Sequence, residues 1–409
     1  MRENPFYKTK YKDLLIPESG LTLRDLDVLP LTDKSEFAAD QESHPPYGTN
    51  LTRPLADYTR LHQTSGTTGT PLRWLDTPES WQWWLECWAE VYEAAGVGPD
   101  DRIFIPFSFG PFIGFWAAFE AGPQVGAITI PAGGLTSEQR VDKLLEYDAT
   151  VVVCTPTYAL RLAQIARDGG KDLAASSVRI TIHAGEPGAS LPNVKARIEE
   201  SWGARCVDHA GATEAGAWGY TCGHADHMHI NEHAFISEVI DSETLEPAPV
   251  ESGETQEGEL VLTNLGRVGS PVIRYRTGDL VELSRAPCTC GRATAFLRGG
   301  VLGRIDQMVT VRGINVYPSA VDNLVRAHGA IDEFEAHVRT EREMGELVLR
   351  IEVTGSDPAA VVRALEDDIH GRLQLRPRIE VVESGSLPRY ELKSKRFRGI
   401  TDDRTPAKD

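Results

Sequence analysis

The stretch TSGTTGTP, from Thr64 to Pro71, places two glycines and five hydroxyl side chains in one short loop. Gly66 and Gly69 can adopt positive φ and so bring backbone N–H groups close to an anion. The hydroxyl groups add donors, and a concave loop of this kind can hold phosphate oxygens. The run does not match the GxxxxGK[ST] phosphate-binding loop. On its residues alone, it is compatible with a plain surface loop or with a phosphate-binding loop.

The segments after this loop alternate between short apolar runs and runs of helical character. Thr77 can cap a helix that has Pro78 in its first turn and ends before Gly96. Strands separated by helices favour parallel sheet layers. The expected strands lie at residues 102–106, 126–131, 150–155, 179–184 and 205–208, and the expected helices at 77–95, 137–147, 157–168 and 191–201.

The pattern changes twice further along the chain. Residues 236–283 favour antiparallel strands joined by turns, and a small α+β domain follows residues 303–306. Its expected helices lie at 319–327 and 358–373, and its expected strands at 335–339, 347–353 and 378–382. A chain of 409 residues is long enough for two or three domains. We therefore expect an α/β fold with layered sheets and helices, an antiparallel β region and a small C-terminal α+β domain.

Composition narrows the classes of partner. The 42 basic and 60 acidic side chains leave a net charge of −18, which disfavours nucleic acid and anionic membrane surfaces. We find no apolar stretch long enough to span a membrane and no signal peptide in the first residues. Six cysteines do not make a disulfide scaffold, so we expect a protein of the reducing cytoplasm.

Eight blocks of sequence occur in the order in which they occur in a known superfamily. On these blocks the chain resembles the adenylate-forming acyl- and aryl-CoA synthetases, most closely the phenylacetate–CoA ligase-like branch. The resemblance runs from about residue 20 almost to the end of the chain. The blocks are TSGTTGTP (64–71), AGEP (184–187), AGATEAG (210–216), GELVLTNL (258–265), YRTGDL (275–280), CTCGR (288–292), LGRIDQMVTVRGINVYPSAV (302–321) and LPRYELKSKR (387–396).

The resemblance implies a division of the chain and a two-step reaction. The adenylation domain would cover residues 1–303, a hinge 304–306, with Asp306 as the hinge residue, and a small mobile domain 307–409. ATP and a carboxylic acid would give an acyl-adenylate and pyrophosphate, and a thiol, first of all coenzyme A, would then take the acyl group. Alternatives are a carrier-protein or amine acceptor in secondary metabolism, a non-carboxylate nucleophile, or a non-catalytic binding protein on this scaffold. The sequence is also compatible with a homodimer.

The resemblance also assigns roles by matching position. Lys393 would reach the adenylation centre and offset the negative charge that develops there. Glu214 would bind the Mg²⁺ that accompanies ATP, since carboxylates are hard oxygen ligands, and Thr213 would contact the α-phosphate. Asp279 would accept hydrogen bonds from the ribose hydroxyls. The implied nucleotide-binding set is Thr64, Ser65, Gly66, Thr67, Thr68, Gly69, Gly185, Glu186, Pro187, Asp279 and Arg304.

Two positions depart from the family's pattern. Thr70 stands where the family often has lysine, which removes a cation from the neighbourhood of the β- and γ-phosphates. Leu392 stands where the family has glycine, directly before Lys393, which we call the late lysine. Lys395, two residues further on, is therefore an alternative to Lys393.

The pocket for the acid is expected at three separate segments. The resemblance places it along FSFGPFIGFW (107–116), beside the AGEP block and beside the AGATEAG block, and an aromatic acid is the predicted substrate. Aromatic side chains can stack on such a ring, although core packing explains most of them equally well. The predicted lining residues are Phe109, Phe112, His183, Ala184, His209 and Gly211.

Three cysteines and one histidine form a candidate metal site. Cys222, His229, Cys288 and Cys290 could close a tetrahedral structural Zn²⁺ site. Some phenylacetate–CoA ligase-like proteins carry such residues at matching places. The alternative is a set of reduced thiols beside a surface histidine cluster, and neighbouring histidines could replace the predicted one; these are His224, His227 and His233.

Overall fold

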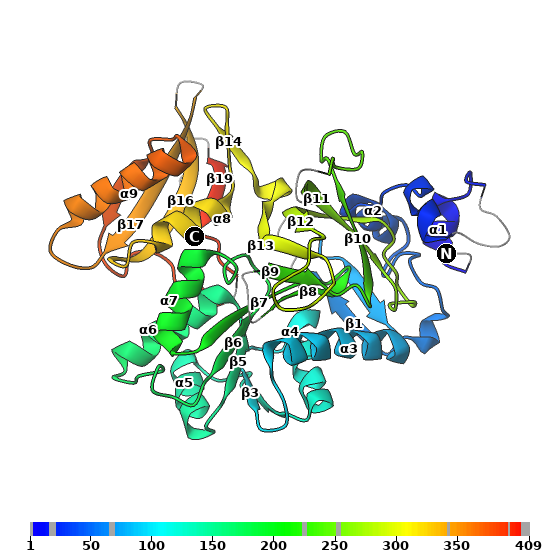
Figure 1. Cartoon of the computed structure of the whole chain (residues 1–409), viewed down its shortest axis with the longest axis horizontal. Helices are drawn as coiled ribbons and strands as arrows, with labels where there is room; N and C mark the ends of the chain where they lie inside the picture. The colour runs from blue at the N-terminus through cyan, green and yellow to red at the C-terminus, as the bar shows by residue number, and fades with distance from the viewer. Residues whose placement is uncertain are drawn as a thin grey trace. The chain divides into compact units, whose positions relative to one another are not determined.

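The structure is a computed structural model that describes residues 3–15, 22–64, 70–222, 227–250, 255–341, 344–391 and 393–401 (Figure 1). Most of the predicted phosphate loop (Ser65, Gly66, Thr67, Thr68 and Gly69), together with His224 and Leu392, lies outside the described residues. The chain forms two compact units. The first comprises Met1–Leu135, Ala149–Val153 and His209–Gly300, and the second Thr136–Asp148, Cys154–Asp208 and Val301–Asp409.

The first unit begins with short helices and a hairpin. Helices α1 (Pro5–Lys10) and α2 (Lys34–Ser43) precede β1 (Arg60–Gln63) and β2 (Arg73–Asp76), which pair antiparallel on either side of the predicted phosphate loop. The long helix α3 (Pro78–Ala95) follows, and it confirms the sequence prediction in detail. The Thr77 hydroxyl accepts the N–H of Ser80, and Gly96 ends the helix at φ 73° in the left-handed region that glycine favours.

Three parallel strands continue this unit. Strand β3 (Arg102–Ile105) pairs with both β4 (Ile128–Pro131) and β5 (Val151–Cys154), close to the predicted ranges. Between β3 and β4 lies helix α4 (Ile113–Ala121), which we did not predict. Its sequence, IGFWAAFEA, is apolar on almost every side, so it lacks the helical alternation of apolar and polar residues.

An antiparallel region completes the first unit. Strands β10 (Phe235–Ile240), β11 (Thr255–Asn264) and β12 (Tyr275–Ser284) form the predicted antiparallel set. Strand β9 (His227–Ile230) pairs with β8 (Gly216–Thr221) and with β13 (Phe296–Arg304), neither of which we predicted. The pairing of β11 with β12 shifts between Glu259 and Val261, which marks a β-bulge opposite the YRTGD block.

The second unit contains helices α5 (Ser137–Glu146), α6 (Pro156–Asp168) and α7 (Pro192–Trp202), all close to prediction. Strand β6 (Ile180–His183) pairs parallel with the first half of β7 (Arg205–Ala212). Helix α6 starts at a capping Thr155, whose hydroxyl accepts the N–H of Tyr158, with Pro156 as its first residue. This start brings the first turn of α6 beside the AGEP block.

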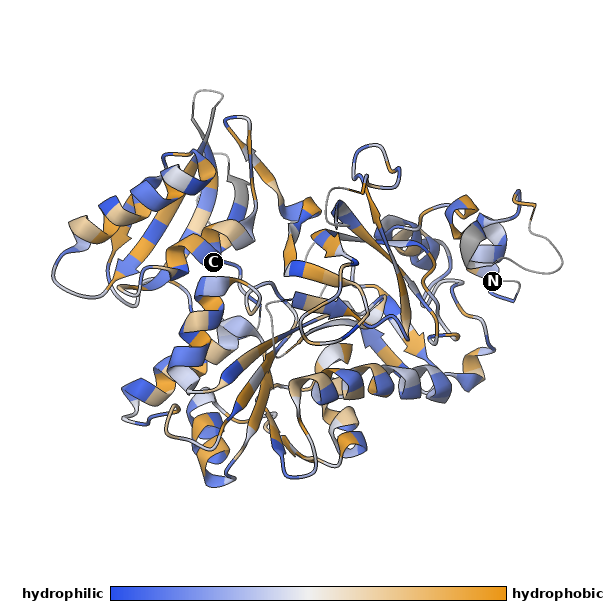
Figure 2. Cartoon of the chain, in the orientation of Figure 1, coloured by the Kyte–Doolittle hydropathy of each residue, from blue (hydrophilic) through white to orange (hydrophobic). Residues whose placement is uncertain are grey.

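Residues after 300 form the predicted small α+β fold within the same unit. Its sheet has the order β18 (Arg378–Val382), β17 (Met344–Val353), β16 (Ile331–Glu341), β19 (Phe397–Thr401). Helices α8 (Pro318–Arg326) and α9 (Pro358–Leu373) and the hairpin β14 (Val309–Val311) and β15 (Ile314–Val316) accompany it. Hydrophobic and hydrophilic residues alternate along α9 and these strands (Figure 2), and the buried ones include Val316, Val321, Val325, Ile331, Leu349, Ile351 and Leu365. The α/β fold class is thereby confirmed.

Candidate functional site

The turn after β6 carries the AGEP block and lies next to the late lysine. Gly185 has φ 95°, a conformation that side chains disfavour, and a Cβ there would lie 3.5 Å from Cε of Lys393. The same Cβ would lie 3.7 Å from Cγ2 of Thr155. In parallel sheets, ligands bind beyond the carboxyl ends of the strands. The second unit therefore brings Lys393 to the edge where a nucleotide site is expected.

Glu186 uses both carboxylate oxygens inside the second unit. Its Oε1 accepts the N–H of Thr157 at 2.9 Å, and its Oε2 accepts the N–H of Ser394 at 2.5 Å. Burial raises the pKa of Glu186, and the hydrogen bonds from Thr157 and Ser394 oppose that rise only in part. The side chain thus contacts α6 and the late-lysine segment, a role that the predicted nucleotide contact did not include.

Arg396 ties the same segment to α6 and β16. Its Nη1 donates to the Thr157 hydroxyl at 3.1 Å, and its Nε and Nη2 donate to Glu333 at 2.5 and 2.8 Å. Burial alone would lower the pKa of Arg396, but its hydrogen bonds and charge pairing with Glu333 raise it above the usual value. The sequence analysis assigns no role to Arg396 or to Glu333, although Arg396 is the last residue of the block LPRYELKSKR.

His183 ends β6 as a buried neutral imidazole. Its Nδ1 lies 3.2 Å from the Cys154 carbonyl oxygen, to which it can only donate. Burial lowers its pKa to about 4, so the ring is uncharged near neutral pH. Among the described residues its Nε2 has no hydrogen-bond partner. Ala184, the other predicted pocket residue of this unit, directly follows His183 and is also buried.

In the first unit, the AGATEAG turn rests on a buried ion pair. Arg267 donates to the carbonyl oxygens of Thr213 and Glu214 at 2.6 and 3.1 Å. The same guanidinium binds both carboxylate oxygens of Asp76 at 2.7 Å, and neither side chain of the pair is exposed to solvent. The backbone that carries the predicted Mg²⁺ ligand is therefore held by two residues that we did not single out in the sequence.

The Glu214 carboxylate already faces a cation. Lys34, the first residue of α2, places Nζ 3.0 Å from Glu214 Oε1. The Glu214 side chain is 7% exposed and that of Lys34 50%. A buried carboxylate with a partly exposed ammonium beside it can exchange that partner for a metal ion, because both are hard cationic partners for oxygen.

The predicted pocket residues of the first unit form two groups, and the first consists of His209 and Gly211 on β7. His209 donates from Nδ1 to the Gly219 carbonyl oxygen at 2.7 Å and packs on Trp88 with ring centroids 4.3 Å apart. A Cβ at Gly211 would lie 3.2 Å from Nε2 of His209, so the glycine leaves that nitrogen room. Burial lowers the pKa of His209 to about 4. His209 and Gly211 are thus close neighbours on β7.

The second group comes from the segment before α4. Phe109 packs against Trp116 and Phe119, with ring centroids 4.6 and 5.4 Å apart, and stays partly exposed. Phe112, directly before α4, covers Gly110 and is also partly exposed. By contrast, Phe107 and Phe115 are buried against each other and belong to the core.

The remaining predicted nucleotide contacts lie directly after β1, within β12 and at the end of β13. The β-bulge in YRTGD has Gly278 at φ 74°, and the Asp279 N–H donates to the Thr277 hydroxyl at 3.1 Å. Thr64 closes the base of its loop, because its hydroxyl accepts the N–H of Leu72 at 3.0 Å. In the second unit, Arg304 forms two hydrogen bonds of 3.0 Å with Asp306, the predicted hinge residue.

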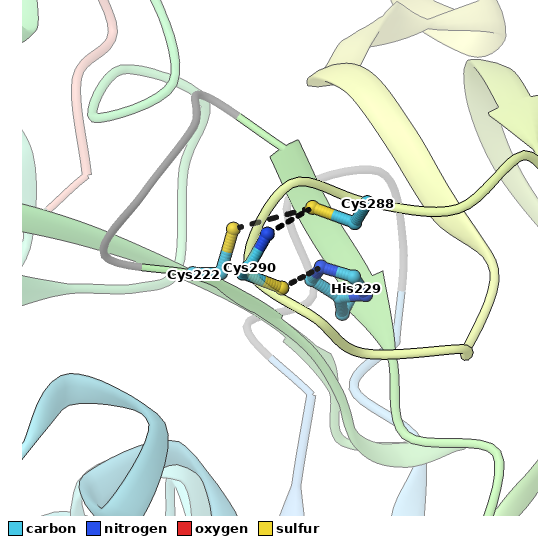
Figure 3. A group of neighbouring side chains, drawn as sticks. All are labelled: Cys222, His229, Cys288 and Cys290. Atoms are coloured by element: carbon cyan, nitrogen blue, oxygen red, sulfur yellow. Dashed lines mark hydrogen bonds between the residues drawn. The ribbon is translucent and has the colours of Figure 1, made fainter.

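The four predicted zinc ligands converge (Figure 3). Their ligand atoms lie within 4.8 Å of one another, although Cys222 and Cys288 are 66 residues apart in the chain. The two sulfurs of this pair are 3.9 Å apart, and Cys290 Sγ lies 3.3 Å from His229 Nε2. Two sulfurs on a tetrahedral zinc with Zn–S bonds of about 2.3 Å would be roughly 3.8 Å apart.

His229 is oriented for such a site. Its Nδ1 lies 3.3 Å from the Thr294 carbonyl oxygen and 3.0 Å from the Thr294 hydroxyl, which leaves Nε2 as the lone-pair nitrogen facing Cys290. Of the neighbouring histidines, His227 lies 3.6 Å from Cys288 Sγ and stacks on Phe296, and His233 is exposed. The donor set and its geometry fit zinc.

Comparisons with known proteins agree with this arrangement of motifs. The sequence model described as AMP-binding enzyme matches residues 19–266, and that of the AMP-binding enzyme C-terminal domain matches residues 313–404. The phenylacetate-coenzyme A ligase of Thermus thermophilus is 29% identical, over 95% of this chain and 90% of that protein. The phenylacetate-coenzyme A ligase of Escherichia coli is 28% identical, over 95% and 89%.

Solved structures extend the comparison. A 2-hydroxyisobutyryl-CoA ligase in the postadenylation state, in complex with 2-HIB-AMP, matches with a TM-score of 0.89 and 28% identity, over 98% of this chain and 86% of that one. The same ligase in the thioesterification state, with 2-HIB-AMP and CoA, matches with a TM-score of 0.71 over the same shares. Within the described part of the chain, no helix has the length and apolar character needed to cross a membrane.

Proposed function

Because the chain belongs to the family of AMP-binding enzymes, we propose that it is an AMP-forming acid–thiol ligase. It activates a carboxylic acid with ATP as an acyl-adenylate and then transfers the acyl group to coenzyme A. The observation that carries this proposal is the position of Lys393 against Gly185 of the AGEP turn. The similarity to phenylacetate-coenzyme A ligases over 95% of the chain supports it.

In the first step, a carboxylate oxygen of the acid attacks the α-phosphorus of ATP, and the bond from phosphorus to the pyrophosphate oxygen breaks. Negative charge builds on the phosphoryl oxygens during this attack. We propose that the Lys393 ammonium stabilises that charge, since a fixed cation is worth most where charge develops away from bulk water. Thr213 is proposed as the contact for the α-phosphate, and Asp279 for the ribose hydroxyls.

Mg²⁺ would supply the charge neutralisation that ATP needs, and Glu214 is the residue proposed to hold it. The carboxylate is almost fully buried and pairs with the Lys34 ammonium. Arg267 donates to the Glu214 carbonyl oxygen and so fixes the backbone from which the carboxylate side chain extends. We also propose Arg304 and the backbone of the turn Gly185–Pro187 as nucleotide contacts, since the Glu186 carboxylate is already engaged by Thr157 and Ser394.

In the second step, the thiolate of coenzyme A attacks the acyl carbon, and AMP leaves. We propose that residues 304–306 form a hinge between an adenylation domain, 1–303, and a small domain, 307–409, as the sequence predicts. The match of a separate C-terminal domain model to residues 313–404 supports this division. A few residues at an element boundary can absorb such a rotation, and Asp306 lies in the short 3₁₀ turn between β13 and β14.

The acid is proposed to be aromatic. Phe109 and Phe112 are partly exposed, unlike the core pair Phe107 and Phe115, and could stack on a ring. His183 and His209 are neutral, so each could exchange a hydrogen bond with a ring substituent without adding charge. Cytoplasmic location is proposed with the function, because ATP and reduced coenzyme A are both available there.

Acid-dependent exchange of pyrophosphate into ATP tests the function directly. The expected result is exchange that needs an aromatic acid and Mg²⁺, followed by thioester formation when coenzyme A is added. A panel of aliphatic acids is the control for substrate class. Absence of exchange with every acid would remove the ligase proposal. Exchange without a thioester would point to a carrier protein or an amine as the acceptor.

We further propose that Cys222, His229, Cys288 and Cys290 hold a structural Zn²⁺ ion. The ion would join the loop that follows β12 to β9 and to the end of β8, because the ligands come from these segments. The converging thiols and the imidazole fixed by Thr294 support the proposal. Closed sites with four protein ligands stabilise a fold and leave no position for a substrate.

Zinc removal is expected to destabilise the first unit. Purified protein should contain about one zinc per chain, and Cys288→Ser should lose the metal and unfold at a lower temperature, because structural zinc contributes folding energy. His227→Ala tests the alternative histidine, and His233→Ala, an exposed histidine of the same region, is the control. Metal content near zero in wild-type protein, or full zinc retention in Cys288→Ser, would contradict the site.

A further inference from the structure

Glu186 connects two segments that are 208 residues apart in the chain. One carboxylate oxygen accepts the N–H of Thr157, the second residue of α6. Such N–H groups have no partner within their own helix, and the helix terminus carries partial positive charge. The other oxygen accepts the N–H of Ser394, directly after Lys393. One carboxylate thus accepts a backbone N–H group from the first turn of α6 and another from the residue after the late lysine.

Arg396 provides an anchor on the other side of the segment. It donates to the Thr157 hydroxyl, so Thr157 contacts both Glu186 and Arg396. It also forms two hydrogen bonds with Glu333 of β16, and only 7% of its surface is exposed. Glu391 contacts Ser137 at 2.9 Å, which holds the segment before the lysine. Lys393 therefore lies between residues that are each fixed to the body of the second unit.

We propose that Glu186 is a positioning residue, which places Lys393 for the adenylation step by fixing the backbone of Ser394. This inference rests on the proposed function, which gives Lys393 its task. Lys393 itself packs with Cε against the glycine that precedes Glu186. The backbone and the side chain of the late lysine are thus held at adjacent residues of one turn.

The energetic argument favours a carboxylate at this position. Lysine has a long, flexible side chain that loses rotamer entropy when its ammonium is held in one place, so the ammonium is placed well only if the backbone is fixed. Hydrogen bonds to an ionised acceptor are about twice as strong as neutral ones. A glutamine offers one acceptor oxygen in place of two and turns an N–H₂ group towards an N–H donor. Displacement of a catalytic group by about 1 Å can cost about 100-fold in rate.

The test separates the two half-reactions. Glu186→Gln is expected to slow adenylate formation about 10- to 100-fold, measured as acid-dependent pyrophosphate exchange, because Lys393 loses its placement. Thioester formation from chemically prepared acyl-adenylate and coenzyme A should stay at the wild-type rate. Glu186→Asp keeps the charge but shortens the reach, so an intermediate loss is expected. Glu366→Gln, an exposed position of α9, is the matched control and should behave as wild type.

A double variant decides whether Glu186 acts through the lysine. Adding Glu186→Gln to Lys393→Ala should cause no further loss of adenylation, since the group to be positioned is gone. A further loss in the double variant, equal loss of both half-reactions, or full adenylation by Glu186→Gln would each overturn the inference. In those cases wild-type exchange remains and the proposed function stands. If wild type shows no acid-dependent exchange, the proposed function fails and this inference fails with it.

Discussion

Lys393→Ala is expected to slow acyl-adenylate formation by about 10²- to 10³-fold, the usual cost of removing one group that stabilises a charged transition state. The thioester half-reaction should be nearly unchanged, because no pyrophosphate leaves in that step. Acid-dependent pyrophosphate exchange measures the first half, and consumption of prepared acyl-adenylate by coenzyme A measures the second.

Lys395→Ala is the matched control for this prediction. Lys395 is exposed, and its only described hydrogen bond is through its backbone oxygen, which accepts the Tyr390 hydroxyl at 3.3 Å. Its side chain should therefore contribute little to adenylation. If Lys395→Ala lost adenylation while Lys393→Ala kept it, the two lysines would have to exchange roles. Equal loss of both half-reactions in Lys393→Ala would contradict its assignment to the adenylation step.

Asp76→Ala is expected to lower the free energy of unfolding by about 3–5 kcal/mol, the largest stability effect that we predict. The substitution leaves the Arg267 guanidinium buried without its carboxylate, beside the rings of Trp74 and Trp84. A buried unpaired charge costs far more than an ion pair at the surface. The measurement is the urea concentration at the midpoint of unfolding, converted with the slope of the transition.

A surface pair in the same unit is the control. Arg298 and Glu282 lie 3.3 Å apart, and their side chains are 47% and 34% exposed. Glu282→Ala should cost no more than about 1 kcal/mol, because water and salt screen exposed ion pairs. A loss in Asp76→Ala as small as that would contradict the buried-pair argument. In addition, Asp76→Ala should weaken Mg²⁺-dependent adenylation, since Arg267 holds the backbone of Thr213 and Glu214.

Most elements of the fold could be predicted because their signals are local. Helix α3 starts at a threonine cap with a proline and ends at a glycine, all readable from adjacent residues. Helix α4 could not be predicted in this way, because an evenly apolar segment has no helical period. Strand β19 (FRGIT) was missed for a related reason. Its five residues show no strict alternation of apolar and polar side chains, and its parallel pairing with β16 supplies the hydrogen bonds that make it a strand.

Within the candidate site, the sequence placed residues in the right blocks but could not assign their contacts. The prediction grouped Cys222, His229, Cys288 and Cys290, and the structure brings them together. The roles predicted for Lys393, Glu214 and Asp279 remain predictions that the experiments above address. The contacts of Glu186 could not be predicted, because no residue near AGEP in the chain indicates that its carboxylate accepts a hydrogen bond from Ser394.

The phosphate loop TSGTTGTP and the blocks that follow it in order determined, from the sequence alone, the family, the fold class and the class of chemistry. Those signals are short and local, because glycine turns, caps and hydroxyl loops require particular residues at adjacent positions. Only the tertiary structure decided which distant side chains meet, as in the pairs Arg267–Asp76 and Glu186–Ser394. It also decided which groups lose their charge, such as His183. The physical reason is that burial and pairing depend on the whole packed chain, in which residues about 200 positions apart share one hydrogen bond.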